Sequence, residues 1–160
     1  MPIRPSASIE VKYTARKGRG VFATQMIPKG TEFERVPVLV MRAQEVMDGD
    51  AEDLLPNYVF EWGKDTVALA LGFGSLYNHS YSPNARYDDV GRMTKVYTAV
   101  RDIQPGEEIT INYNGSEDDL APVGFDVEET PTQVRTARTA SRNGKLAERS
   151  ASASKAISSL

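Results

Sequence analysis

The chain has 160 residues, of which 40% are hydrophobic, enough for one hydrophobic core and too few for two. It has no cysteine and a single histidine, so disulfides, cysteine-ligated zinc and thiol nucleophiles are excluded and no metal site is expected. No apolar run approaches the roughly 20 residues that span a bilayer, and residues 1–5 lack the apolar core of a signal peptide. We therefore expect a soluble, cytoplasmic protein with no membrane partner.

The charges are unevenly distributed along the chain. Residues 1–129 carry 13 basic and 21 acidic side chains, a balance of −8, whereas residues 130–160 carry six basic and one acidic, a balance of +5. An acidic body attracts basic partners, and binding to duplex nucleic acid normally requires a basic face. We therefore expect a basic protein or peptide as partner and no direct nucleic-acid ligand. Ordinary solubility charge is the alternative.

The first third of the chain predicts strands separated by glycine and proline turns. Residues 9–13 alternate as a strand does, and a second strand resumes at residues 21–23. Between them, Gly18-Arg19-Gly20 predicts a loop in which glycine permits positive φ and brings the backbone close to a ligand. A plain hairpin turn is the alternative, because no helix follows to complete a dinucleotide-binding motif. Residues 31–40 predict one or two strands, with a bulge or a sheet edge at Pro37.

The rest of the body continues this pattern with at most one helix. Residues 43–55 predict an imperfect acidic helix or a helical loop, which Gly49 weakens and Pro56 ends. Further strands are expected at residues 58–62, 66–71, 85–90, 93–100 and 109–113. Short strands joined by glycine and proline turns predict a mainly β domain whose core is complete near residue 114.

The only histidine of the chain lies in a polar segment that fits no regular element. The stretch Asn78-His79-Ser80-Tyr81-Ser82-Pro83-Asn84 neither alternates like a strand nor tolerates a helix, so we expect an ordered polar loop or knot. A buried amide or imidazole without a partner costs about 1–3 kcal/mol, so both side chains should bond to backbone or to a ligand. A turn with one structural histidine is the alternative.

Four motifs in a fixed order resemble those of a known family. They are Gly18-Arg19-Gly20-Val21-Phe22-Ala23, Tyr58-Val59-Phe60, Asn78-His79-Ser80 followed by Pro83-Asn84, and the run from Pro105 to Tyr113. Together they resemble the SET-domain protein lysine methyltransferases over residues 9–114, and most of all the compact viral and bacterial members. The resemblance implies a SET-type fold of short curved β-sheets with little helix and a C-terminal pseudoknot.

The resemblance also implies a cofactor and the place where it binds. The family uses S-adenosyl-L-methionine, whose sulfonium methyl passes to a lysine amine by SN2 attack. The cofactor contacts would fall at Lys17, Gly18, Arg19, Gly20, Asn78, His79 and Tyr113. Only the neutral amine attacks, and a desolvated channel lowers the pKa of lysine from its usual value of about 10.4. The transfer requires alignment and exclusion of water, and it requires no metal.

Three tyrosines take family roles in the transfer. By resemblance, Tyr113 would orient the methyl and the amine, while Tyr58 and Tyr87 would line the lysine channel. Tyr87 falls where the family alternates Phe and Tyr, which implies a preference for fewer methyl groups. Each tyrosine alone has the alternative of packing in a sheet. Because the chain lacks the cysteine-rich zinc segments of many eukaryotic relatives, Phe125 is the candidate to pack near the adenine.

The expected organisation has four parts. They are an N-terminal arm at residues 1–8, a catalytic domain at 9–114, a candidate docking segment at 115–129 and a basic disordered tail at 130–160. The expected function is methylation of a lysine in a basic protein tail, such as that of a histone-like or ribosomal protein. The alternative is a non-catalytic SET-fold module that binds peptides or regulates a partner, and a homodimer is left open.

The basic tail suggests one further hypothesis. Lys145 or Lys155 could be automethylated, or could act as a pseudosubstrate against the acidic body. A solvated linker is the alternative.

Overall fold

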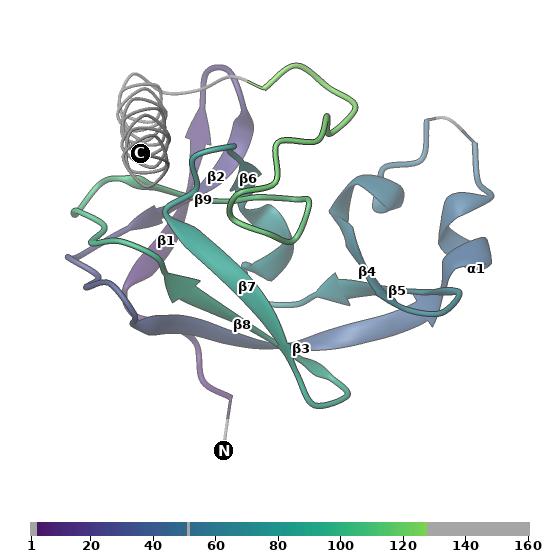
Figure 1. The fold of residues 1–160 in the computed structure, drawn as a ribbon, viewed down its shortest axis with the longest axis horizontal. Helices are drawn as coiled ribbons and strands as arrows, with labels where there is room; N and C mark the ends of the chain where they lie inside the picture. The colour runs from purple at the N-terminus through teal and green to yellow at the C-terminus, as the bar shows by residue number, and fades with distance from the viewer. Residues whose placement is uncertain (1–2, 51, 128–160) are drawn as a thin grey trace, which may run out of the picture.

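The computed structural model describes residues 3–50 and 52–127, which form two β-sheets with short helices between their strands (Figure 1). The larger sheet has the strand order β4 (Val59–Gly63), β5 (Thr66–Ala70), β3 (Glu32–Arg42), β8 (Thr94–Ala99) and β7 (Ala85–Val90). The smaller sheet has the order β1 (Ile9–Thr14), β2 (Gly18–Ala23), β9 (Glu108–Ile111) and β6 (Asn78–His79). The helices are α1 (Ala43–Met47) and two 3-10 helices, η1 (Leu55–Tyr58) and η2 (Gly74–Leu76). The prediction of a mainly β fold is confirmed.

One hydrophobic core joins the two sheets. Its buried side chains come from β1, β2 and β9 of the smaller sheet, from β3, β5, β7 and β8 of the larger sheet, and from Ile27, Tyr77 and Ile103 outside the strands. Val21, Ile109 and Ile111 are fully buried in it from one side, and Tyr97 is fully buried from the other. Burying one large aliphatic side chain stabilises a fold by about 1.5–3 kcal/mol. Apolar contacts between the sheets therefore hold in place the strands that carry the polar site.

Strand β3 runs along the base of the molecule in Figure 1 and changes partner midway. Its first half, residues 32–37, pairs with β8, and its second half, residues 38–42, pairs with β5. Pro37 lies at the junction, where its carbonyl oxygen accepts from the backbone N–H of Leu71 at 3.1 Å. The bulge expected at Pro37 lies instead between Glu32 and Glu34, and the strand is central in its sheet. Proline is tolerated there because β3 changes its partner strand from β8 to β5 at that residue, where the backbone N–H that proline lacks is not needed for pairing.

Two further expectations about local structure are corrected. The turn of the first hairpin lies at residues 15–17, and Gly18-Arg19-Gly20 belongs to β2, where Gly18 pairs with Thr14 and Gly20 with Lys12. Of the segment 43–55, predicted as an imperfect helix or a helical loop, only Ala43–Met47 is α-helical, and Arg42 provides no side-chain cap for it. A helix this short has few internal hydrogen bonds to offset its nucleation.

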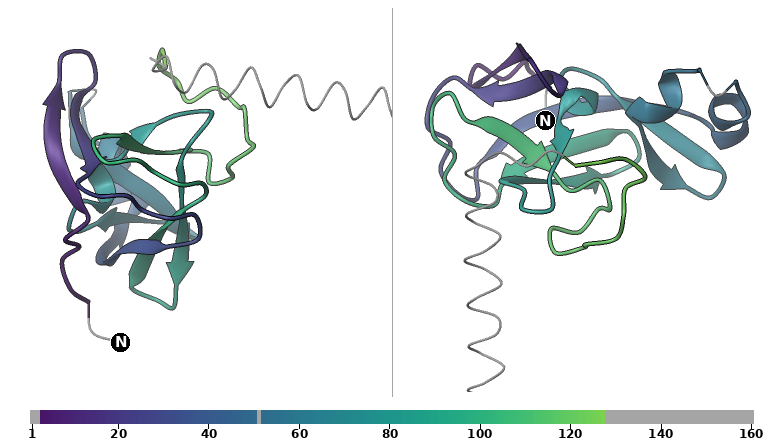
Figure 2. Two further views of the ribbon diagram at one scale, coloured as in Figure 1. Left: turned by 90° about the vertical axis from the view of Figure 1, so that its left-hand side faces the viewer. Right: turned by 90° about the horizontal axis from the view of Figure 1, so that it is seen from above.

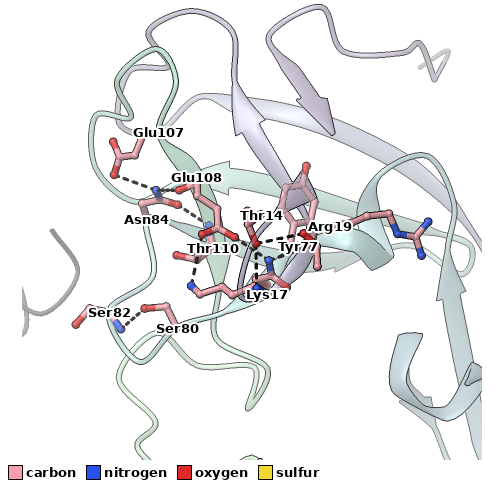
Figure 3. A network of polar contacts seen from close by, with 12 residues as sticks. Thr14, Lys17, Arg19, Tyr77, Ser80, Ser82, Asn84, Glu107, Glu108 and Thr110 are labelled. Carbon is pink, nitrogen blue, oxygen red and sulfur yellow. Dashed lines mark hydrogen bonds and ion pairs between the residues drawn. The ribbon is translucent and has the colours of Figure 1, made fainter. Parts of the chain in front are cut away.

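The polar segment around the histidine is interlocked with the last strand. Strand β9 lies between β2, which is antiparallel to it, and the two-residue β6, which is parallel to it. The backbone N–H of Ser80 donates to the carbonyl of Ile111 at 2.9 Å. The Asn84 amide donates to the Glu108 carbonyl at 2.8 Å and accepts from the Thr110 N–H at 2.9 Å (Figure 3). Residues 78–84 are thus the ordered polar knot that the sequence predicts.

The described residues contain no helix long and apolar enough to cross a bilayer. Within residues 3–50 and 52–127 there is also no group of three or more His, Cys, Asp or Glu side chains that could hold a metal ion. The basic tail at 130–160, with Lys145 and Lys155, lies outside the described residues.

Candidate active site

A buried carboxylate organises the side chains around β2, β6 and β9. Glu108, whose side chain is only 9% exposed, accepts a hydrogen bond from the Asn78 amide at 2.7 Å. Its other oxygen lies 3.4 Å from Nζ of Lys17, and Asn78 also donates to the Arg19 carbonyl at 3.1 Å. Figure 3 shows Lys17, from the turn between β1 and β2, close to Glu108 of β9, while the Arg19 side chain extends away from them. Hydrogen bonds to a charged acceptor are the stronger kind, so the network fixes the Asn78 side chain.

Glycine is required at position 20 because β2 passes directly under this network. An ideal Cβ on Gly20 would lie 2.8 Å from Oε1 of Glu108 and 3.0 Å from Nδ2 of Asn78. No side chain fits at such distances without displacing a group that is already hydrogen-bonded. The close backbone approach expected of Gly18-Arg19-Gly20 is therefore present, although the segment is a strand and not a loop.

His79 is buried and contacts the residues that follow β9. The residue is 4% exposed, and its Nδ1 accepts a hydrogen bond from the backbone N–H of Tyr113 at 3.0 Å. The imidazole centroid lies 5.2 Å from the ring of Tyr113 and 6.2 Å from the ring of Phe125. The bond to backbone ties β6 to the chain just beyond β9, as the sequence led us to expect for a buried imidazole.

The hydroxyl of Tyr113 is held in one orientation. It donates to the carbonyl oxygen of Tyr77 at 2.7 Å, and the hydroxyl of Tyr87 donates to the Tyr113 carbonyl at 3.4 Å. Partial burial of its hydroxyl, and to a smaller extent the charges of the nearby Tyr58 and Glu108, raise the pKa of Tyr113 to about 12. Tyr113 is therefore a neutral phenol at physiological pH, with its proton directed to Tyr77 and its oxygen lone pairs still available as acceptors.

Two cavities meet at this tyrosine. The acidic cavity, of about 540 Å³, is named for Glu61 and Asp119 in its lining and also contains Tyr87. The basic cavity, of about 610 Å³, is named for Lys17 and Arg19. Six residues line both cavities, namely Asn57, Tyr58, Val59, Ser75, Tyr77 and Tyr113. The two cavities therefore adjoin along these six residues, and the ring of Tyr113 belongs to both linings.

The predicted site residues are brought together around these cavities. Tyr58 and Tyr113 lie in the shared wall, and the Arg19 guanidinium reaches the Tyr58 hydroxyl at 3.5 Å. A smaller cavity of about 300 Å³ is lined by Lys17, Asn78, His79 and Tyr113, together with Phe125. Gly18 and Asn78 also line the basic cavity, whereas Gly20 lies beneath it in the network described above.

The segment after β9 covers one side of the site. Residues 113–127 form a long loop beside β6 and β9 (Figures 1 and 2). The carbonyl of Ala121 accepts from the Tyr81 hydroxyl at 3.2 Å and from the Asn114 amide at 2.8 Å. The Phe125 ring lies 6.1 Å from that of Tyr113. These contacts hold the loop at the rim of the basic cavity and of the smaller cavity, both of which Phe125 lines.

Sequence reasoning missed two residues that support the site. Glu108 belongs to the motif from Pro105 to Tyr113. Its position directly before the alternating residues Ile109–Ile111 was the signal that could have placed this acid at the start of a strand. Glu34 had no local signal, because its partner lies far along the chain. Its buried carboxylate accepts from the Tyr77 hydroxyl at 2.6 Å and from the Phe73 N–H at 3.0 Å. Burial raises the pKa of Glu34, while these two donors oppose the rise.

Comparison with known proteins decides the family. Residues 18–114 match the SET domain. The chain belongs to the SET-domain family. It is 37% identical over 106 residues to a histone-lysine N-methyltransferase specific for H3 lysine 37 from Schizosaccharomyces pombe, covering 66% of this chain and 72% of the relative. It is 32% identical over 122 residues to a histone-lysine N-methyltransferase specific for H3 lysine 36 from Cryptococcus neoformans. That match covers 69% of this chain but spans only 14% of the relative's length.

A solved structure agrees with these relatives. The crystal structure of a proposed histone methyltransferase from Plasmodium falciparum superposes with a TM-score of 0.56 at 29% identity, covering 71% of this chain and 97% of the other. The predictions of a SET-type fold and of a protein-lysine methyltransferase are confirmed. The likeness to compact viral and bacterial SET domains stays a prediction.

Proposed function

We propose that this SET domain transfers a methyl group from S-adenosylmethionine to a lysine of a histone-like basic protein, with the cofactor in the basic cavity and the lysine in the acidic cavity. The observation that supports this assignment most directly is the shared wall, where Tyr58, Tyr77 and Tyr113 line both cavities. A direct transfer between two bound molecules requires that their sites touch at one place and that water be excluded there.

The residues of the basic cavity suit the chemical groups of the cofactor. Lys17 offers an ammonium to a carboxylate, and Phe125, a residue that is 55% exposed, offers an aromatic face that is available to an adenine ring. Asn78 and His79 are fixed by Glu108 and by the Tyr113 backbone, so their polar groups are preorganised. When bound, S-adenosylmethionine supplies an electrophilic methyl group on a positively charged sulfur.

The acidic cavity suits the side chain of a substrate lysine. Its aromatic wall, with Tyr58, Phe60 and Tyr87, packs well against a four-carbon stem, and Glu61 and Asp119 attract a cation to its mouth. The Tyr113 hydroxyl donates its proton to Tyr77, so its oxygen can accept a hydrogen bond from the incoming amine. The amine loses its proton to water before attack, and low polarity along the aromatic wall favours the neutral form.

The relatives guide the choice of substrate. The S. pombe and C. neoformans proteins are named for lysines of histone H3. We propose a histone-like tail for this chain as well, with a ribosomal protein as the alternative basic target. A histone substrate would place the activity at chromatin, in contrast to the cytoplasmic location that the sequence suggested. The four-part organisation, the homodimer and the lack of a direct nucleic-acid ligand stay predictions.

The proposal is tested by transfer of label from methyl-labelled S-adenosylmethionine to mixed histones and to isolated ribosomal proteins. The wild-type chain should label a band in one of these pools, and Tyr113→Phe should reduce the rate by about 100-fold or more, as expected when a single oriented polar group at a reaction centre is removed. Tyr97→Phe is the matched control, because its hydroxyl also donates to a backbone carbonyl, that of Gly74 at 2.8 Å, but it lines neither cavity.

Two outcomes would overturn the proposal. Equal loss of activity in Tyr113→Phe and Tyr97→Phe would show that the tyrosine at the shared wall has no role beyond stability. Binding of the cofactor by calorimetry with no transfer to any protein would favour the non-catalytic SET-fold module, which retains the site but does not use it.

A further inference from the structure

Lys95 is a lysine buried in the interior of the larger sheet. Its side chain is 0% exposed, and its Nζ lies 2.5 Å from Oδ1 of Asp89, which stands opposite it on β7. Burial lowers the pKa of Lys95, and the hydrogen bond and charge of Asp89 oppose that effect. Removing an ammonium from water costs several kcal/mol even when it is paired, so an apolar side chain would fill the same space more cheaply. The charge therefore calls for a role beyond packing.

Three aromatic rings surround the ammonium. Its Nζ lies 4.3 Å from the ring centroid of Phe60, 4.3 Å from that of Tyr87 and 5.4 Å from that of Trp62. A cation over an aromatic face is attracted by about 2 kcal/mol or more when both are shielded from water. This attraction depends on the ring presenting its face, so it selects one ring orientation in a way that an apolar contact does not.

Two of these rings also form the wall of the acidic cavity. Phe60 and Tyr87 line it, whereas Lys95 does not, so the ammonium lies behind the wall. The two rings meet edge to face, with centroids 5.1 Å apart and planes at 65°. The ammonium contacts each ring from the side away from the cavity. By fixing the orientation of the ring, it also fixes the surface that the ring presents to the cavity.

We propose that Lys95 is a positioning residue that holds Tyr87 and Phe60 in the orientation that narrows the acidic cavity, and thereby limits how many methyl groups a substrate lysine receives. This inference rests on the proposed function, in which the acidic cavity takes the lysine. Each methyl group on the amine makes it wider, and one methyl group more or less in a tight apolar site changes binding by about 1–3 kcal/mol. A wall that is free to move would admit the wider amines.

The first test compares product distributions on one substrate peptide. Wild type, Lys95→Met and Lys95→Arg are run to completion, and the mono-, di- and trimethylated products are quantified by mass spectrometry. Lys95→Met should raise the ratio of higher products to monomethyl product by about tenfold or more, since 1–3 kcal/mol corresponds to that factor. Lys95→Arg should keep the wild-type ratio, because it restores the cation. Lys64→Met, a charge removal in the turn between β4 and β5, is the matched control and should change nothing.

The order of action is tested with a double variant. If Lys95 works through Tyr87, then Lys95→Met should have little further effect on the product ratio in a Tyr87→Phe background. Cofactor affinity should stay within about twofold of wild type in Lys95→Met, since Lys95 lines neither cavity. An unchanged product ratio in a folded, active Lys95→Met variant would overturn the proposal.

A second measurement needs no substrate. Ring-flip rates of Tyr87 and Phe60 can be followed by NMR of labelled aromatic side chains in the chain alone, and they should rise in Lys95→Met but not in Lys64→Met. Unchanged ring dynamics would overturn this inference even if no substrate is found, whereas absence of methyl transfer with faster ring flips would count against the proposed function only. If Lys95→Met does not fold, Asp89→Asn removes the counter-charge at a half-exposed position and should shift both readouts in the same direction. A folded Asp89→Asn variant that shifts neither readout would likewise refute the role of Lys95.

Discussion

The replacement Gly20→Ala tests whether the network under the basic cavity is as tight as the distances imply. The new methyl group would lie 2.8 Å from Oε1 of Glu108, so the carboxylate would have to move by several tenths of an ångström. That oxygen accepts from Asn78 at 2.7 Å, and losing a hydrogen bond to a charged group costs about 1.5–3 kcal/mol. Alanine regains about 0.5–1 kcal/mol over glycine in a strand. The net loss should be about 1–2 kcal/mol.

The loss should appear in two assays. The midpoint of thermal unfolding should fall by about 4 °C or more, since this is the usual shift per kcal/mol for a domain of this size. Calorimetric titration with S-adenosylmethionine should show an affinity about tenfold weaker, because Asn78 and Lys17 both lose their fixed partner. Gly63→Ala is the control, since its Cβ would meet only Oγ1 of Thr66 at 3.3 Å. If Gly20→Ala and Gly63→Ala behave alike in both assays, the account of the network is wrong.

Four further predictions concern the side chains of Tyr113, Tyr77 and Asn84. Because the pKa of Tyr113 is raised to about 12, its phenol stays neutral up to about pH 10. Methyl transfer should therefore become faster as the pH rises to about 10, since the substrate lysine loses its proton. A loss of activity near pH 9 in folded protein would contradict this. The same shift means that the stability contributed by Tyr113 is complete below the unfolded pKa of about 10 and is lost toward pH 12, which alkaline unfolding curves can measure. Tyr77→Phe leaves the buried carboxylate of Glu34 with only the Phe73 N–H as a donor and should cost about 1.5–3 kcal/mol in urea unfolding. Glu34→Leu should partly reverse that cost in the double variant. Asn84, which is 1% exposed, makes three side-chain hydrogen bonds, to Glu107, to the Glu108 carbonyl and to the Thr110 N–H. Asn84→Ala should therefore cost about 2–4 kcal/mol, and a loss under about 1 kcal/mol would refute its role in the knot.

Local patterns in the sequence account for most of the strands. Alternating residues at 9–13 and 109–113 and the turn at Gly91 mark strands that the structure contains. The alternation does not report burial, because Ile109, Thr110 and Ile111 are all fully buried and Tyr13 is exposed. Pro37 was misjudged because its tolerance depends on β5 and β8 sharing one strand between them, which no local pattern reports. The five-residue helix was overextended because composition does not reveal a missing cap.

The site divides in the same way. The residues assigned by resemblance, such as Asn78 and Tyr113, came with the motifs and needed no knowledge of geometry. Glu34 and Lys95 could not be found, because each acts through side chains more than 30 residues or several strands away: Glu34 through Tyr77 and Lys95 through Phe60. A buried charge in a strand has no sequence signature that distinguishes it from an exposed charge at the same alternation.

The smaller sheet has a consequence for how the protein folds. Its strands come from residues 9–23, 78–79 and 108–111, and β9 must be in place before β2 and β6 share a partner. Such distant pairings impose a large entropic cost of loop closure, and they form late and together. The basic cavity cannot exist in a partly folded chain or in a fragment that ends before residue 108. Ligand binding there should slow amide exchange in β2, β6 and β9, because opening of these strands dismantles the cavity.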